Sequence, residues 1–486
     1  MNDRTQPQEG NFLPGEITID TISLVNQERE VVELKNITAQ VDIFEGIDNA
    51  FLSGRVSIFD GVNFHRNYKV YGQESLTIKY RVKEDGTQFG KQAEKTFRIY
   101  KTSNVQNMPG YTTDSLAIHF IDPRYFQCEQ KRISQTFRGS YSEILLKSLL
   151  KHGGFEQQTG SSPIEYWDKS YPENKQIVCG NWSLNRLIRY INENANYEEN
   201  AGWRNSMFFY QAMHRGFRFM ALDTMLSGNT EHAVSFTYRP KNAVIGQEET
   251  PNVSQGGHNS KILQFEYPHK GDTLAGVKTG TYSSSLRVFD PIRNIEKEIY
   301  YDMQETFDRN KDKHLSGFPL IRTEEFEDIY SVQEPVADDE YQANKIQSDT
   351  SLNQAYLIGG KTHYKVNNSN AYSDSPKLQD TSQYTGEEHT DNSFLEGIAA
   401  RENLSQYTVK VTVPMRDDVS VGQVVHLDLP RPEVGAKDED LLNDNRYLVT
   451  KIRHSFSPGE FRGTMTMMCA KESFAKNLSE EFLPNE

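Results

Sequence analysis

The stretch that decides the fold occurs twice, once near each end of the chain. The first copy reads YGQESLTIKY at 71–80, TFRIYKTSNVQNMPG at 96–110 and DSLAIHF at 114–120. The second copy reads VGQVVHLDLP at 421–430, RYLVTKIRHSFSPG at 446–459 and GTMTMMC at 463–469. Both copies alternate apolar and polar residues with the period of a β-strand, so both predict small β-modules.

Three anchors hold the two copies in register. Gly72-Gln73 corresponds to Gly422-Gln423 with an offset of 350 residues, and so does Phe97 to Tyr447. Pro109-Gly110 corresponds to Pro458-Gly459 with an offset of 349. A fixed period of this kind indicates an internal duplication, and two similar modules on one chain favour a quasi-symmetric ring. The predicted structural turns of the repeated module are Gly54, Gly72, Pro109, Gly110, Gly422, Pro458 and Gly459.

Length and composition indicate a multidomain globular protein. The 486 residues suffice for about three domains of ~150 residues. The mean hydropathy is -0.71, and no run approaches the ~20 apolar residues that span a bilayer. The N-terminal residues 1–15 are polar, lack the apolar core of a secretory signal, and are predicted to form a flexible arm.

Charge and cysteine content narrow the function classes further. Cys128, Cys179 and Cys469 are odd in number and show no C-x-x-C spacing, so a reducing cytoplasm is expected. The net charge is -15, and no block rich in lysine and arginine suggests a duplex-binding surface. An acidic wall repels DNA that slides past it.

The segments between the two copies differ in character. Residues 123–226 predict an α+β unit whose first helix is capped by Ser140 and ends at Gly153-Gly154, and whose second helix is capped by Ser183. Strands return at 227–272. Residues 273–395 are the least regular part, and 392–406 predict a short helix.

Motifs typical of enzymes are present only as short matches. Ser148 with Lys151, then Ser183-Leu184-Asn185, then Lys278-Thr279-Gly280 match the order of penicillin-binding enzymes. That chemistry needs its serine at the start of a helix, whereas Ser148 falls near a predicted helix end. The run from Gly86 to Lys91 has the wrong spacing for a phosphate loop.

No catalytic, cofactor or metal residue is therefore predicted. The histidines lack metal-ligand spacing, and the acidic clusters at 324–340 and 433–444 lack the calcium-loop pattern. A solvated face or a protein-docking surface is the expected role of both clusters. A carboxylate pair that folding brings together leaves no mark in the sequence, so a hydrolase stays open.

Several stretches resemble the central baseplate hub proteins of contractile phage tails, relatives of the hub portion of type VI secretion spikes. They are FLSGRVSIFDGVNFHRNYKVYGQESLTIKY, NWSLNRLIRYINENA with SMFFYQAMHRGFRFMALDTM, KILQFEYP, GTYSSSLRVFDPIRNIEKEIYYDM, and DVSVGQVVHLDLP with NRYLVTKIRHSFSPGEFRGTMTM. The resemblance covers residues 16–272 and 392–474, and the chain departs from the family at 273–395 and 433–444.

The resemblance implies a mainly β fold with an α+β insertion, two similar small antiparallel β-barrels and a peripheral insertion domain. It implies a homotrimer whose six barrels form a ring that adapts the sixfold tail tube to the threefold central spike. Further partners would be wedge and tape-measure proteins. DNA would pass through without specific binding. The protein would lie in the virion tail after assembly in the host cytoplasm, without a membrane span.

The predicted division of the chain follows from the two copies. It comprises an arm at 1–15, a first barrel at 16–126, an α+β domain at 127–226, a second barrel at 227–272 with 396–474, a peripheral domain at 273–395 and a tail at 475–486. Two alternatives remain for the function. They are a cell-wall hydrolase carried on a tail tip and a module that binds host-surface glycans.

Overall fold

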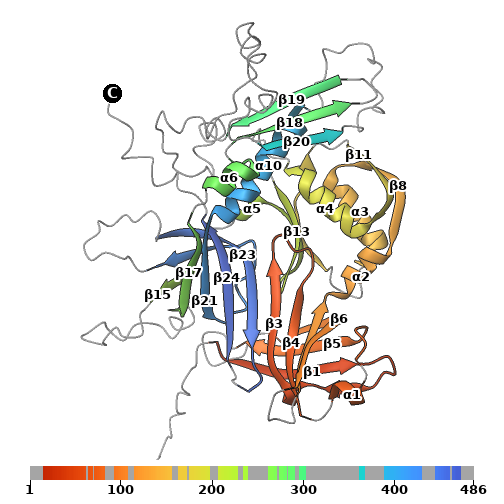
Figure 1. The fold of residues 1–486 in the computed structure, drawn as a ribbon, viewed down its shortest axis with the longest axis vertical. Coiled ribbons are helices and arrows are strands. Elements are labelled where there is room, and N and C mark those ends of the chain that lie inside the picture. The colour runs from red at the N-terminus through yellow and green to blue at the C-terminus, as the bar shows by residue number, and fades with distance from the viewer. Residues whose placement is uncertain are drawn as a thin grey trace, which may run out of the picture.

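The computed structural model shows a mainly β protein with a few helices (Figure 1). The fold class predicted from the sequence is confirmed in this respect. The structure describes residues 15–61, 64–68, 70–82, 92–107, 114–155, 163–171, 175–197, 206–227, 234–238, 261–270, 273–281, 283–290, 295–302, 361–366, 388–429, 444–459 and 462–471.

The first module contains seven strands in the spatial order β2-β1-β5-β6-β7-β4-β3. Its inward side chains, such as Ile43, Ile78 and Phe97, are fully buried, as the period-two pattern predicts. The strands are β1 (Ile17–Val25), β2 (Val31–Glu33), β3 (Thr38–Gly46), β4 (Ser53–Asp60), β5 (Ser75–Val82), β6 (Ala93–Asn107) and β7 (Asp114–Ile121), with the short helices η1 (Lys35–Ile37) and α1 (Phe64–Asn67).

The second module repeats this arrangement as β16-β15-β22-β23-β24-β21-β17. The two modules therefore match strand for strand. In the second module, however, β17 and β21 come from chain segments more than 130 residues apart. The strands are β15 (Ser235–Tyr238), β16 (Lys261–Ile262), β17 (Gln264–Lys270), β21 (Tyr407–Pro414), β22 (Val424–Asp428), β23 (Asp444–Phe456) and β24 (Gly463–Lys471).

A shared irregularity supports the duplication. The pairing of β6 with β7 shifts at Tyr100, and the pairing of β23 with β24 shifts at Thr450. These β-bulges lie 350 residues apart, the offset that the sequence anchors predict. Such bulges bend and twist a strand at a defined position, so the two modules share a detail of backbone shape as well as a strand order.

Two features were not part of the expected pair of small antiparallel barrels. First, β23 pairs with β3, so the strands of both modules belong to one 14-stranded sheet. Second, β15 runs parallel to both β16 and β22, whereas β1 runs antiparallel to β2 and β5. Parallel neighbours need a long connection, and residues 239–423 separate β15 from β22.

The α+β segment follows the first module and has its own apolar core. The predicted caps are confirmed, since the Ser140 hydroxyl accepts from the Glu143 N–H and the Ser183 hydroxyl accepts from the Arg186 N–H. Its elements are α2 (Pro123–Gln130), β8 (Arg132–Gly139), α3 (Tyr141–His152), β9 (Ile164–Trp167), β10 (Ser170–Tyr171), β11 (Lys175–Ser183), α4 (Leu184–Asn194), β12 (Asn196–Tyr197), β13 (Met207–Ala212), β14 (Gly216–Ala221) and α5 (Leu222–Ser227).

Elements between β17 and β21 form a further layer, drawn at the top of Figure 1. There β18 lies between β19 and β20 in a three-stranded sheet, and α10 packs against this sheet, α4 and β21. The elements are α6 (Thr273–Thr279), β18 (Ser283–Asp290), β19 (Ile295–Asp302), β20 (Lys361–Val366) and α10 (Glu388–Gln406). In the described part of the chain no helix is long and apolar enough to cross a membrane.

Candidate functional site

The two modules meet where β23 pairs with β3, and we call this strand pair the seam. The pairing is antiparallel, with Lys451 opposite Gly46 and Phe456 opposite Val41. The strand β22 occupies the same edge of β23 only along residues 444–448. Because backbone N–H and C=O groups need partners when they are buried, the rest of that edge recruits β3. The strands β3, β4, β23 and β24 lie side by side in Figure 1.

On one face of the seam, Asp42 joins the two modules through two arginines. Its Oδ2 accepts from Arg55 Nε at 2.9 Å, and its Oδ1 accepts from Arg453 Nε at 3.0 Å. Burial by itself raises the pKa of Asp42, but hydrogen bonds from Arg55, Gln40 and other neighbours outweigh it and hold the pKa below its ordinary value. Asp42 is 1% exposed, whereas the arginine side chains are 42% and 40% exposed.

On the opposite face, Glu45 is completely buried and ties three parts of the chain together. Its Oε1 lies 2.9 Å from Nε2 of His454 in the second module. Its Oε2 accepts from the backbone N–H of Met213 at 2.7 Å. Met213 belongs to the turn between β13 and β14, so the tip of the α+β hairpin enters the junction between the modules.

Aromatic rings surround this carboxylate. The His214 ring lies 5.9 Å from the His454 ring and 6.3 Å from the Tyr80 ring, and Tyr80 lies 5.2 Å from Phe456. Burial, together with the neighbouring His454 and Lys95, lowers the pKa of His214 to about 3. His214 is therefore neutral in the folded protein at neutral pH. We call Glu45, Tyr80, His214 and His454 the junction cluster.

The predicted turn residues occupy different kinds of position. Gly72 and Gly422 have φ angles of +90° and +77°, which L side chains rarely adopt, and they precede β5 and β22. Pro458 and Gly459 lie in the turn between β23 and β24. Pro109 and Gly110 lie outside the described residues.

The expectation that Gly54 forms a turn is wrong. It lies inside β4, where an added Cβ would stand 2.3 Å from the carbonyl oxygen of Asp42 and 2.4 Å from the Phe120 ring. Glycine at this position permits the close approach of β3 and of Phe120. Gly54 therefore contributes to the packing next to the seam.

The turns before β5 and β22 refine the alignment of the copies. Glu74 Oε1 accepts from the N–H of Tyr71, and Gln423 Oε1 accepts from the N–H of Ser420, each three residues earlier. These equivalent side chains stand 349 residues apart, whereas Gly72 and Gly422 stand 350 apart. One residue is therefore missing from the second copy between the glycine and the side chain that closes the turn.

Sequence reasoning did not single out the junction cluster. The sequence does contain a signal for it, because each residue falls on the buried side of its strand. Glu45 alternates in step with Val41 and Ile43 on β3. His454 alternates in step with Ile452 and Phe456 on β23. A polar residue on the apolar phase of a strand needs a buried partner. Alternation alone does not name that partner.

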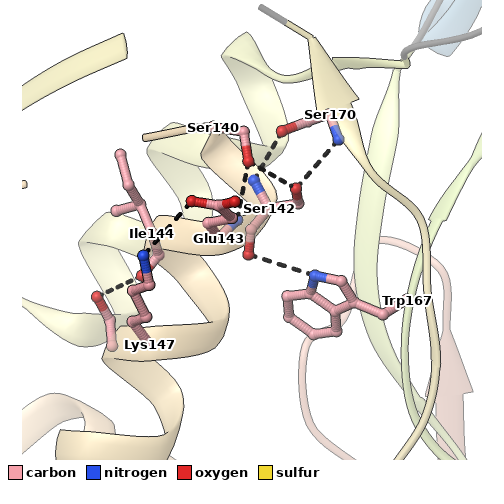
Figure 2. A network of polar contacts seen from close by, with 8 residues as sticks. Ser140, Ser142, Glu143, Ile144, Lys147, Trp167 and Ser170 are labelled. Carbon is pink, nitrogen blue, oxygen red and sulfur yellow. Dashed lines mark hydrogen bonds and ion pairs between the residues drawn. The ribbon is translucent and has the colours of Figure 1, made fainter. Parts of the chain in front are cut away.

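The serines of the enzyme-like motif have structural partners. Ser148 Oγ donates to the Ile144 carbonyl at 2.6 Å within α3. Figure 2 shows the start of this helix, where Ser142 and Ser170 exchange backbone-to-hydroxyl hydrogen bonds of 2.7 and 3.1 Å. Trp167 Nε1 donates to the Ser142 carbonyl at 3.3 Å. These bonds fix α3 to the strands β9 and β10.

The described residues contain no group of three or more His, Cys, Asp or Glu side chains that could hold a metal ion. The three cysteines are buried and unpaired, and burial raises the pKa of Cys179 to about 11. The candidate functional site is therefore the junction between the two modules. It consists of the seam between β23 and β3, and the junction cluster beneath it.

Comparison with known proteins gives matches at the level of structure. No protein-family model matches the sequence, and no curated protein matches it significantly. A tail protein from Neisseria meningitidis MC58 is similar over 92% of this chain and 96% of its own, with 10% identity and a TM-score of 0.47. The 43 kDa tail protein of prophage MuSo2 from Shewanella oneidensis is similar over 93% of this chain and 98% of its own, with 9% identity and a TM-score of 0.45.

A third neighbour is the Escherichia coli c3393 protein, described as a component of the type VI secretion system. The similarity covers 95% of this chain and 78% of that one, with 9% identity and a TM-score of 0.37. Two of these neighbours are described as tail proteins and the third as a type VI secretion component. Because identity is low and the TM-scores lie below 0.5, the function is argued below from this chain's own geometry.

Replacing Glu45 by leucine should destabilise the junction strongly. The substitution leaves His454 Nε2 and the Met213 N–H buried without their Glu45 partner, which costs about 2–5 kcal/mol. Urea unfolding followed by tryptophan fluorescence measures the change. The matched control is Glu266→Gln, which removes an exposed partner of Lys410 and should change stability by less than about 0.5 kcal/mol. Equal unfolding midpoints for Glu45→Leu and the native chain would contradict the role of Glu45.

Stability should fall in acid because His214 is held neutral. The unfolded chain binds a proton near the ordinary pKa of 6.5, whereas the folded chain binds it only near 3. Between these values the unfolded state holds more protons, so stability decreases by up to about 1.4 kcal/mol per pH unit as pH falls. The variant His214→Phe keeps an aromatic ring and should flatten the curve of urea midpoint against pH over this range. Parallel curves for the two proteins would refute the assignment.

Proposed function

We propose that this chain is the structural hub of a contractile-tail baseplate and that it acts as a homotrimer. Three chains would place six modules around one axis, joining a sixfold tail tube to a threefold central spike. The observation that carries the proposal is the seam. It is a strand pairing between two similar modules, and within the described residues the equivalent edges of β6 and β17 have no strand beside them.

The unpaired edges follow from the match between the modules. The strand β6 corresponds to β23, and β17 corresponds to β3. Within the first module β5 pairs with residues 93–98 of β6, which leaves the same edge of residues 101–107 without a strand in the described part of the chain. There, too, β17 pairs with β21 alone. Long open edges recruit other strands.

If the seam pairing were repeated between neighbouring chains, the open edges of β6 and β17 would both gain a partner strand. The strand β6 of one copy would pair antiparallel with β17 of the next, as β23 pairs with β3 within each chain. Arg453 and Phe44 are direct partners in the seam. Their equivalents are Ser103 on β6 and His269 on β17, so these two residues would be direct partners between chains. Head-to-tail contacts of this kind generate a closed ring when the rotation closes. The family resemblance supplies the number of three chains.

The proposed domain division follows the same logic. The barrels at 16–126 and at 227–272 with 396–474 would form the ring, and the α+β domain at 127–226 would lock each seam through its β13–β14 hairpin. The domain at 273–395 would decorate the outside, between the arm at 1–15 and the tail at 475–486. Tail tube, spike, wedge and tape-measure proteins would be the partners, and the assembled protein would lie in the virion tail.

Cross-linking tests the proposed ring contact. A chain carrying Ser103→Cys and His269→Cys should form disulfide-linked dimers and trimers under mild oxidation, because directly paired strand residues lie within about 4.5–5.5 Å between Cα atoms. Non-reducing electrophoresis detects the ladder, and light scattering on the native chain should give the mass of a trimer.

The controls for this experiment are the two single-cysteine variants, which should remain uncross-linked because the native cysteines are buried. A second control pairs Ser103→Cys with Thr18→Cys, a residue of β1 that already lies opposite Arg81 of β5. A ladder from the control pair but not from Ser103 with His269 would sink the proposed register. A monomeric mass in the presence of tube and spike proteins would sink the trimer.

A further inference from the structure

The face of the sheet that points away from the apolar core has a charge opposite to that of the chain as a whole. Directly paired strand residues share a face, so the register identifies its members. One row runs from Glu266 through Lys410 and Met468 to Lys451. A second row runs from Ser455 through Asp42, Arg55 and His119 to Lys101.

Arg453 lies between these rows, two residues from Lys451 on the same strand. Among the described side chains at these positions, five carry a positive charge and two a negative one, an excess of three on a chain of net charge -15. We call this set the basic face. It comprises Arg55, Lys101, Lys410, Lys451 and Arg453.

The cations of the basic face are accessible, and two of them are held in place. Lys101 and Lys451 are exposed, and Lys410 is 45% exposed with one surface partner, Glu266, at 3.3 Å. Arg55 and Arg453 each use Nε to bind the buried Asp42. This single anchor fixes both guanidinium groups, with Arg453 also contacting Asp42 through Nη2 at 2.9 Å, while the two arginine side chains are 42% and 40% exposed. Burial lowers the pKa of His119, and its strand partners Lys101 and Arg55 lower it further.

The ring proposed above determines where the basic face lies, and the inference rests on that proposed function. The opposite face of the sheet carries the apolar core, the junction cluster and the β13–β14 hairpin. These layers are too bulky for the axis of a ring closed through strand pairing. Among the described residues no layer packs on the other face, so in this ring the basic face would turn toward the axis and line the channel.

We propose that the channel binds the phosphate backbone of double-stranded DNA through the basic face. Neighbouring positions on the same face favour DNA over an acidic polypeptide, because small hydroxyl side chains stand beside the cations. Ser57 and Thr412 lie two residues from Arg55 and Lys410, and Thr466 lies opposite Arg453. Such a surface offers hydrogen bonds to phosphates but no pocket for the side chains of a peptide. The contact is independent of base sequence.

The acidic remainder of the chain does not cancel this attraction. Charges in solvent are largely screened beyond a Debye length of about 8 Å at physiological salt, so DNA near the axis responds to the nearest side chains. The sequence predicted a wall that repels DNA, and the register instead concentrates cations on the one wall that the ring would turn toward it. Weak, salt-dependent retention of DNA is the expected consequence.

Fluorescence anisotropy with a labelled duplex tests the proposal on the full chain. The native chain should bind a duplex of about 30 base pairs near 50 mM salt, and log affinity should fall with log salt by about 0.9 for each phosphate contact. The variant Lys410→Gln/Lys451→Gln keeps Asp42 and both arginines paired. It should bind at least about tenfold more weakly and show a shallower salt slope.

The matched control is Lys147→Gln/Lys151→Gln, which removes two exposed lysines of α3, outside the sheet. It should bind DNA like the native chain. Equal loss in both variants, no binding by the native chain, or tighter binding of poly-glutamate than of DNA would each overturn the proposal. Light scattering on the same samples separates the two proposals. A trimer that ignores DNA refutes the basic face alone, and a DNA-binding chain that never forms a trimer refutes the ring alone.

Discussion

The structure depends on one constraint, which is that the edge of a long β-strand must find hydrogen-bonding partners along its whole length. The strand β23 spans Asp444–Phe456, and β22 satisfies only its first part. The rest of the edge takes β3 from the other end of the chain. Every larger feature follows from this pairing: the single sheet through both modules, the common apolar core and the burial of Asp42 and Glu45 on its two faces.

The polar groups at the seam give this pairing its register. A slip of one residue would exchange the two faces of β3 and move Glu45 away from His454 while turning Asp42 into the core. Both carboxylates are almost fully buried, so such a slip would leave charged groups without partners at a cost of several kcal/mol. The Arg55–Asp42–Arg453 bridge and the Glu45–His454 contact therefore act as specificity elements. The β13–β14 hairpin adds a third part of the chain to the same point.

Much of the local structure could be predicted from residues in sequence order. The alternation in LTIKY places Leu76, Ile78 and Tyr80 inside, and Ser140 and Ser183 begin the two helices that they were expected to cap. The offset of 350 residues reappears as a shared bulge at Tyr100 and Thr450. These features depend on contacts between residues close in sequence, or on repetition, and both are visible without a fold.

Other features were missed because they depend on partners far apart in the chain. Gly54 was expected in a turn, but it lies inside β4, where the absence of a side chain lets Phe120 pack against the strand. The parallel pairing of β15 with β22 depends on a path through residues 239–423, which alternation does not describe.

The sequence by itself determined the duplicated strand pattern, the positions of the capped helices and the net negative charge, since each is a property of residue order and composition. Only the tertiary structure decided that the two copies share a sheet, that Glu45 and His454 meet 409 positions apart, and that Lys101, Arg55, Arg453, Lys451 and Lys410 lie on one face. The physical reason is strand register. Which residues stand opposite each other across a sheet is set by hydrogen bonds between distant segments, and no local pattern encodes that choice.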